Sequence, residues 1–155
     1  MRKENLRAIS GHLLNMARGH LEQTGIVLPV VFSLKANQIP KHRVVKASAE
    51  IPGAMKELCA DSEALIVVLE SRVLDTEGRD VRALTARDDG TIDLSNEPKA
   101  EEVLLAVVHT KEGSEMRTIR YAKAEKGYGY FDRGWEKLKE LPPDLKNPYL
   151  EGGAI

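Results

Sequence analysis

A histidine and two charged residues lie where apolar strands are expected to end. His109 follows the apolar run 103–108, and Glu70 and Arg72 follow the run 64–69. An imidazole beside a carboxylate is a common pair for general acid–base catalysis. If the two strands are parallel neighbours, these groups meet at one edge of the sheet, as the candidate catalytic residues of a small metal-independent hydrolase. The alternative is structural, because any buried strand turns polar where it reaches solvent.

Aromatic residues are concentrated near the C-terminal end of the chain, where six of the seven fall within the last 35 residues. There they alternate with glycine and basic residues. Tyrosine and tryptophan combine a large apolar area with a polar group, which suits a binding surface. The pattern predicts a partner-binding surface made of Tyr128, Tyr130, Phe131, Arg133 and Trp135. The alternative is that these rings pack a short C-terminal helix, expected over residues 133–141, onto the sheet.

The other reactive residue types form no recognisable site. A single cysteine, Cys59, excludes a multi-cysteine zinc site and is expected to be a small core residue. The chain has no P-loop, no dinucleotide-binding fingerprint and no G-x-S-x-G motif. We therefore expect no metal ion and no cofactor. None of the four histidines has metal-ligand spacing; they are His12, His20, His42 and His109.

Composition points to an ordinary globular domain. The 155 residues are 42% apolar and 30% charged, with a net charge of −1, well away from the disordered class. A net charge so close to zero gives no argument for nucleic acid, and we expect no nucleic-acid partner. No apolar run approaches the ~20 residues of a membrane span, and the first residues lead into no secretory core. We expect no membrane association and a cytoplasmic protein.

Apolar periodicity predicts the main elements. Residues 4–24 form a helix with an apolar stripe that includes Leu6, Ile9, Leu13 and Met16, and Gly25 ends it. The runs 64–69 and 103–108 are continuously apolar and β-branched, as in strands buried on both faces. The other expected elements are strands at 27–34, 43–48 and 115–123, a helix at 51–61, and a loop at 71–101 with a small hairpin at 82–94.

These elements predict an α+β fold: a single mixed, largely antiparallel sheet of about five strands, with the N-terminal amphipathic helix and two short helices packed on it. Residues 1–145 form one domain and 146–155 a flexible tail. Helices about 10 Å wide are too few to cover both faces of such a sheet. Because two strands require burial on both faces, we expect a homodimer in which a second copy supplies the missing cover.

The element order is similar to that of deaminase-like and JAB-type metallohydrolase sheets. The first family requires His-x-Glu with paired cysteines, and the second requires His-x-His with a downstream aspartate. The chain has neither motif, so the order alone implies no activity. The leading hypothesis is a non-enzymatic intracellular binding module, acting as a homodimer on a protein or small-ligand partner. The alternative is the hydrolase built on His109, Glu70 and Arg72.

Overall fold

The computed structural model describes residues 2–74, 100–123, 126–138 and 141–151. Six strands form one antiparallel sheet in the order β2-β1-β3-β4-β5-β6, which confirms the predicted α+β class with six strands instead of about five. The strands are β1 (Val30–Leu34), β2 (Lys41–Val44), β3 (Ala64–Leu74), β4 (Ala100–Thr110), β5 (Gly113–Lys123) and β6 (Tyr128–Leu138). The hairpin expected at 82–94 lies outside the described residues.

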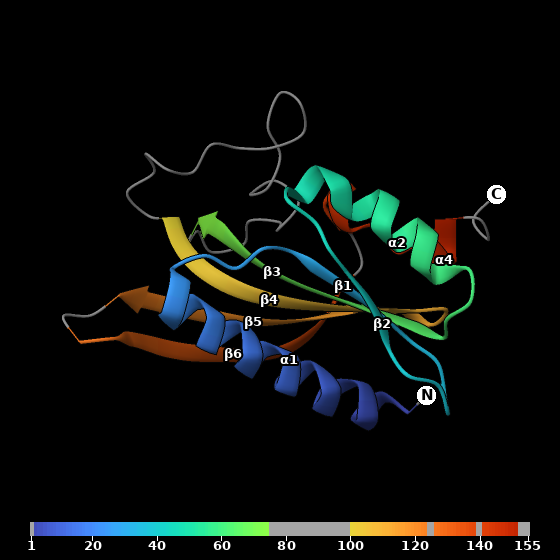
Figure 1. Ribbon diagram of the computed structural model, residues 1–155, viewed down its shortest axis with the longest axis horizontal. Coiled ribbons are helices and arrows are strands. Elements are labelled where there is room, and N and C mark those ends of the chain that lie inside the picture. The colour runs from blue at the N-terminus through green and yellow to red at the C-terminus, as the bar shows by residue number, and fades with distance from the viewer. Residues whose placement is uncertain (1, 75–99, 124–125, 139–140, 152–155) are drawn as a thin grey trace.

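The N-terminal helix α1 (Lys3–Thr24) lies across one face of the sheet (Figure 1). Its buried side chains recur every three or four residues, the helical period. Gly25 ends the helix with a φ of 75° and donates its N–H to the Leu21 carbonyl. Glycine adopts this left-handed conformation without steric cost. The predicted helix and its stop are therefore confirmed.

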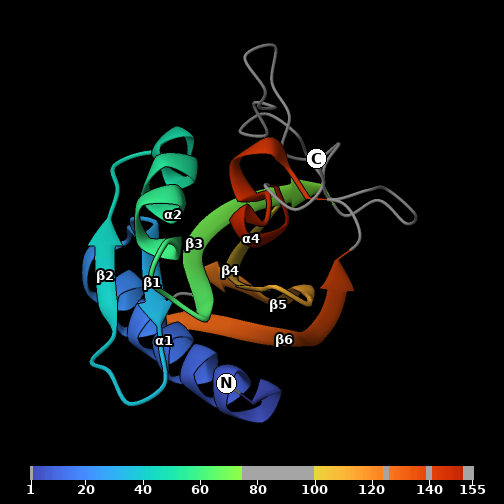
Figure 2. The same cartoon turned by 90° about the vertical axis from the view of Figure 1, so that its right-hand side faces the viewer.

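Short helices cover the opposite face, as the turned view shows (Figure 2). They are α2 (Ile51–Cys59), preceded by the 3-10 turn η1 (Ser48–Glu50), then the 3-10 turn η2 (Pro143–Leu145) and α4 (Pro148–Glu151). Every helix in the described ranges is too short or too polar to span a bilayer.

The two continuously apolar runs form the central strands of the sheet, between α1 on one face and the short helices on the other. β3 pairs with β4, and alternate residues enter different core clusters: Leu65 and Val67 pack under α2, whereas Ile66 and Val68 pack under α1. Leu65, Ile66 and Val67 are fully buried. One copy of the chain thus covers both faces of β3 and β4. The packing argument for a second copy, made from the sequence, does not hold for these two strands.

The helix expected over 133–141 is wrong, because the chain continues as strand β6 to Leu138. Tyrosine, phenylalanine and tryptophan favour the pleated, half-buried surface of a strand. Backbone pairing with the full length of β5 overrides the helix-forming residues that follow Trp135. Gly134, with a φ of 77°, lies beside an irregularity in the β5–β6 register. Such a conformation suits a bulge and interrupts a helix.

Residues 146–151, which the sequence places in a flexible tail, pack against the sheet. Asn147 is buried and its side-chain amide donates to the carbonyl oxygens of Thr110 (2.8 Å) and Gly113 (3.1 Å). The hydroxyls of Tyr149 and Ser62 lie 2.5 Å apart. The amide satisfies backbone acceptors at the β4–β5 turn, which gives this segment a fixed place.

Candidate functional site

The structure does not bring His109, Glu70 and Arg72 together. Because β3 and β4 are antiparallel, His109 pairs with Leu65, and Glu70 pairs with Leu104. Five residues of strand, about 17 Å at the usual rise, separate the two positions. His109, as the strand partner of Leu65, lies on the α2 side of the sheet. Glu70 lies on the α1 side, where it contacts Tyr121. Arg72 lies still farther along β3. No single reacting centre can be in reach of all three.

The Glu70 carboxylate makes hydrogen bonds that stabilise the fold. Its carboxylate accepts the Tyr121 hydroxyl (2.7 Å) and the Val27 backbone N–H (3.1 Å). Burial, together with the neighbouring Glu70 carboxylate, raises the pKa of Tyr121, so the phenol remains a hydrogen-bond donor. Glu70 therefore fastens the chain between α1 and β1 to the sheet.

His109 lies in the core with no access to solvent. Its Nδ1 is 2.7 Å from the Ser114 hydroxyl, which also receives the Asn147 amide (3.2 Å). Within the described residues, Nε2 has no hydrogen-bond partner. Burial lowers the pKa of His109 to about 4, so the ring is neutral at pH 7. Serine beside histidine is the beginning of a nucleophilic site. Ser114 lines a cavity at the end of the sheet, but the His109 ring is fully buried behind it.

The predicted aromatic surface is divided between the two faces of β6. Tyr128, Tyr130 and Trp135 lie on the α1 side and pack against its core cluster. The Arg18 guanidinium lies 4.5 Å from the Tyr130 ring centre, and the Arg7 guanidinium 5.4 Å from that of Trp135. These cation–π contacts connect α1 to the edge of the sheet.

Phe131 lies on the opposite face of β6 and is 64% exposed. Its strand partner is Arg120, whereas the flanking Tyr130 pairs with Tyr121. Arg133 is also exposed. The five predicted partner-binding residues therefore do not share one surface, and three of them contribute to the packing of α1.

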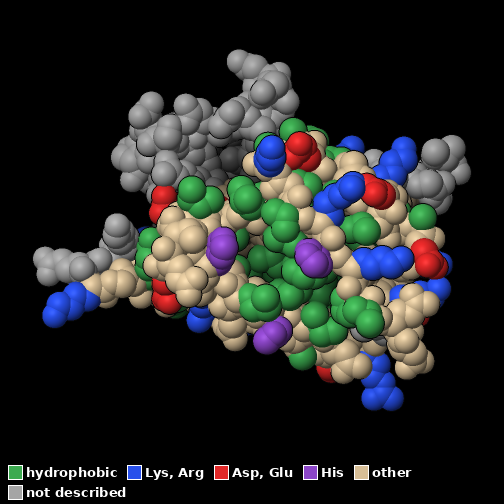
Figure 3. Space-filling view, in the orientation of Figure 1, with side chains coloured by type: hydrophobic (Ala, Val, Ile, Leu, Met, Phe, Trp, Pro, Cys, Tyr) green, Lys and Arg blue, Asp and Glu red, His purple; other side chains and the backbone are tan. Residues whose placement is uncertain are grey.

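A different apolar surface is open to solvent, between α1 and the β1–β2 hairpin (Figure 3). We call it the hairpin face. Val30 pairs with Val44 and Phe32 with His42, so these four side chains share the α1 side of the sheet. Across from them, α1 presents three apolar side chains at spacings of three and four. The face consists of Ile9, Leu13, Met16, Val30, Phe32 and Val44, with histidines at its border.

The sequence contained a signal for this face. Its predicted apolar stripe included Ile9, Leu13 and Met16, but the residues that α1 buries are Leu6, Ser10, Leu14, Ala17 and Leu21. The apolar arc of the helix is therefore wider than the sheet surface beneath it. Met16 is 58% exposed as a result, and Val44, on the edge strand β2, is 52% exposed. The excess became visible only when the sheet beneath the helix was known.

Comparisons with protein-family models, curated proteins and solved structures find no match to this chain. Among the described residues, no group of three or more His, Cys, Asp or Glu side chains is placed to hold a metal ion. The assignment of a function therefore rests on the chain's own surfaces.

Proposed function

We propose that the protein is a non-enzymatic binding module that forms a homodimer through the hairpin face. The observation that supports this proposal is the continuous apolar surface between α1 and the β1–β2 hairpin (Figure 3). Monomeric proteins rarely leave large apolar patches uncovered, and such patches mark interaction sites. Packing two hairpin faces against each other removes both from water.

The distribution of charge on α1 favours a second copy over a charged partner. All five Lys, Arg and Glu residues of α1 fall on the side away from the hairpin face: Lys3, Glu4, Arg7, Arg18 and Glu22. Four of them contact β5 or β6. A charged partner would find no opposite charge on this part of the helix and would lose hydration without compensation. An identical apolar face fits, because a two-fold axis brings the same patch from each subunit together.

Face-to-face packing is also favoured over pairing of the exposed β2 edges. Lys41 and Arg43 alternate with His42 and Val44 along β2, and their side chains lie on the other face of the sheet. Antiparallel pairing of two β2 strands about His42 would place Lys41 opposite Arg43 of the second copy. Like charges directly opposite each other destabilise a strand pair, and lysine on an edge strand commonly prevents such pairing.

Substitution of Met16 tests the dimer. Wild-type protein is expected to have twice the 17.2 kDa chain mass in light scattering at micromolar concentration. Met16→Lys is expected to raise the dimer dissociation constant at least about 100-fold, because a lysine would be buried in an apolar interface without a partner. Val44→Lys, on the opposite wall of the face, should have the same effect.

The matched control is Phe131→Lys, which introduces the same charge at an exposed apolar residue on a different surface. This variant should remain dimeric, and thermal unfolding of all three variants should show that each is folded. A wild-type protein that is monomeric throughout the micromolar range contradicts the proposal. Equal dissociation by Phe131→Lys and Met16→Lys would also contradict it, since the interface would then not be specific to the hairpin face.

A further inference from the structure

Two histidines stand on the two walls of the hairpin face. His20 follows Leu13 by seven residues and Met16 by four on α1, so the three side chains share one side of the helix. His42 on β2 pairs with Phe32 on β1, and the centres of their rings lie 5.8 Å apart. Both histidines are exposed, and Figure 3 shows histidine side chains around this apolar surface.

A dimer formed through the hairpin face covers both imidazoles. Met16 lies one helical turn before His20, and Val44 lies two residues after His42 on the same face of β2. A second copy that removes Met16 and Val44 from water therefore reaches the neighbouring histidines as well. The two-fold axis supplies each histidine twice, so four imidazoles enter the interface.

His20 has no carboxylate beside it on α1. The helix carries no charged residue three or four positions from it. Arg18 and Glu22, two residues before and after it, lie on another side of the helix, where both contact Tyr130 on β6. These two charges cannot follow His20 into the hairpin face.

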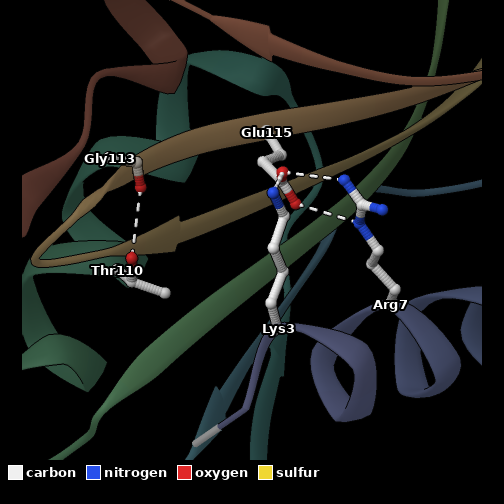
Figure 4. Close-up of polar contacts among 5 residues, drawn as sticks. All are labelled: Lys3, Arg7, Thr110, Gly113 and Glu115. Atoms are coloured by element: carbon white, nitrogen blue, oxygen red, sulfur yellow. Dashed lines mark hydrogen bonds and ion pairs between the residues drawn. The ribbon is translucent and has the colours of Figure 1, made fainter.

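The start of α1 has the same arrangement of charge (Figure 4). Lys3 Nζ and Arg7 Nη2 lie 2.8 Å and 2.9 Å from a carboxylate oxygen of Glu115 on β5. The charges of these turns therefore lie toward the far strands of the sheet. The wall that α1 contributes to the hairpin face is uncharged.

His42 has no carboxylate beside it either. Residues 25–47, which contain the hairpin, include no Asp or Glu, so every charged residue of this segment is a cation. Lys41 and Arg43 flank His42 but lie on the other face of the sheet, where Arg43 forms an ion pair with a glutamate of α2. On the α1 side of β3, the Glu70 carboxylate is already bound by hydrogen bonds within the subunit.

The protonation state of these histidines therefore affects the interface. A neutral imidazole is compatible with an apolar interface, whereas an imidazolium loses hydration there and requires an opposite charge. The second copy brings the same uncharged walls and supplies none. The monomer thus takes up protons more readily than the dimer, and acid shifts the equilibrium toward the monomer.

We propose that His20 and His42 make the homodimer pH-dependent, so that it is stable at neutral pH and dissociates in mild acid. This inference rests on the proposed dimer through the hairpin face. One histidine that titrates ordinarily in the monomer but must stay neutral in the dimer raises the dissociation constant about tenfold at pH 5.5. Because the two-fold axis duplicates each residue, either histidine alone gives about 100-fold.

Sedimentation equilibrium at pH 8.0 and pH 5.5 measures the effect. The wild-type dissociation constant is expected to be at least about 100-fold higher at pH 5.5. The double variant His20→Gln/His42→Gln keeps neutral polar side chains, so its dissociation constant should change less than about tenfold between the two pH values. Circular dichroism should show folded protein at both, and His109 stays neutral in the folded chain at pH 5.5.

His12→Gln is the matched control. His12 is two residues from both Ser10 and Leu14, which α1 buries, so it lies on the opposite side of the helix from the sheet. This variant should keep the wild-type pH dependence.

The outcomes separate this inference from the proposed function. A wild-type protein that is monomeric at pH 8.0 contradicts the proposed function, and this inference with it. A dimer with the same dissociation constant at both pH values contradicts only the role of the histidines. Their role is also contradicted if His12→Gln removes the pH dependence as completely as the double variant does.

Discussion

Acidification from pH 6.5 to pH 4 is expected to lower the free energy of unfolding by about 3 kcal/mol through His109 alone. The ring has no access to solvent, and burial lowers its pKa from 6.5 to about 4. Its hydrogen-bonding partner is a neutral hydroxyl, that of Ser114, which cannot stabilise a positive charge as a carboxylate would.

The direction of the effect follows from which state binds the proton first. The unfolded chain protonates His109 near pH 6.5, whereas the folded chain resists protonation until about pH 4. The contribution to stability is therefore complete above pH 6.5. It decreases by about 1.4 kcal/mol per pH unit down to pH 4, and does not change further below that pH.

Urea unfolding of the wild type and of His109→Leu, across this pH range, measures the effect. The leucine removes the titrating group and the Nε2 atom that lacks a partner, so stability at pH 7 should change by no more than about 1 kcal/mol. The two curves should separate as the pH falls, with the variant becoming the more stable. His12→Gln, at an exposed position of α1, should keep the wild-type pH dependence. Parallel curves for the wild type and His109→Leu would contradict the prediction, because they would show that His109 has the same pKa in the folded and the unfolded chain.

Trp135→Ala is expected to lower the free energy of unfolding by about 2–3 kcal/mol. The tryptophan is half-buried against the α1 core cluster and lies beneath the Arg7 guanidinium. Its removal leaves a cavity between α1 and the edge of the sheet and ends the cation–π contact. The loss is smaller than for a fully buried ring because part of the side chain already faces water.

Phe131→Ala is the matched substitution, because Phe131 is on the same strand but 64% exposed on the other face. It should change stability by no more than about 0.5 kcal/mol. Chemical denaturation of both variants decides whether the β6 aromatics are core or binding surface. Equal and small losses would show that Trp135 does not hold α1, and would restore a role for the whole segment as a partner-binding surface.

Elements that depend on local patterns could be predicted from the sequence. The spacing of apolar residues and the glycine at position 25 identified α1. The helical periodicity and the glycine that ends the helix are both local features of the sequence. The apolar runs of β3 and β4 indicated burial on both faces, and both runs are buried. A strand that is covered on both faces of a sheet needs apolar residues at every position, and these two runs have them.

Local patterns failed where pairing between distant segments decides the structure. Residues 133–138 have helix-forming neighbours, yet they form part of β6 because β5 supplies backbone partners along the whole strand. Asn147 is a polar residue in the segment 146–155, which the sequence predicts to be flexible. It is buried because the β4–β5 turn presents carbonyl groups at the right distance.

The candidate sites depended on tertiary structure even more strongly. The sequence identifies the histidine, glutamate and aromatic residues. The direction of the strands determines which of these residues lie close together. Antiparallel pairing of β3 and β4 places His109 at one end of the ladder and Glu70 five residue pairs away from it. The hairpin face combines side chains from α1 with strands that are distant in the sequence. Composition and periodicity describe single elements, whereas a site is defined by the distances between them.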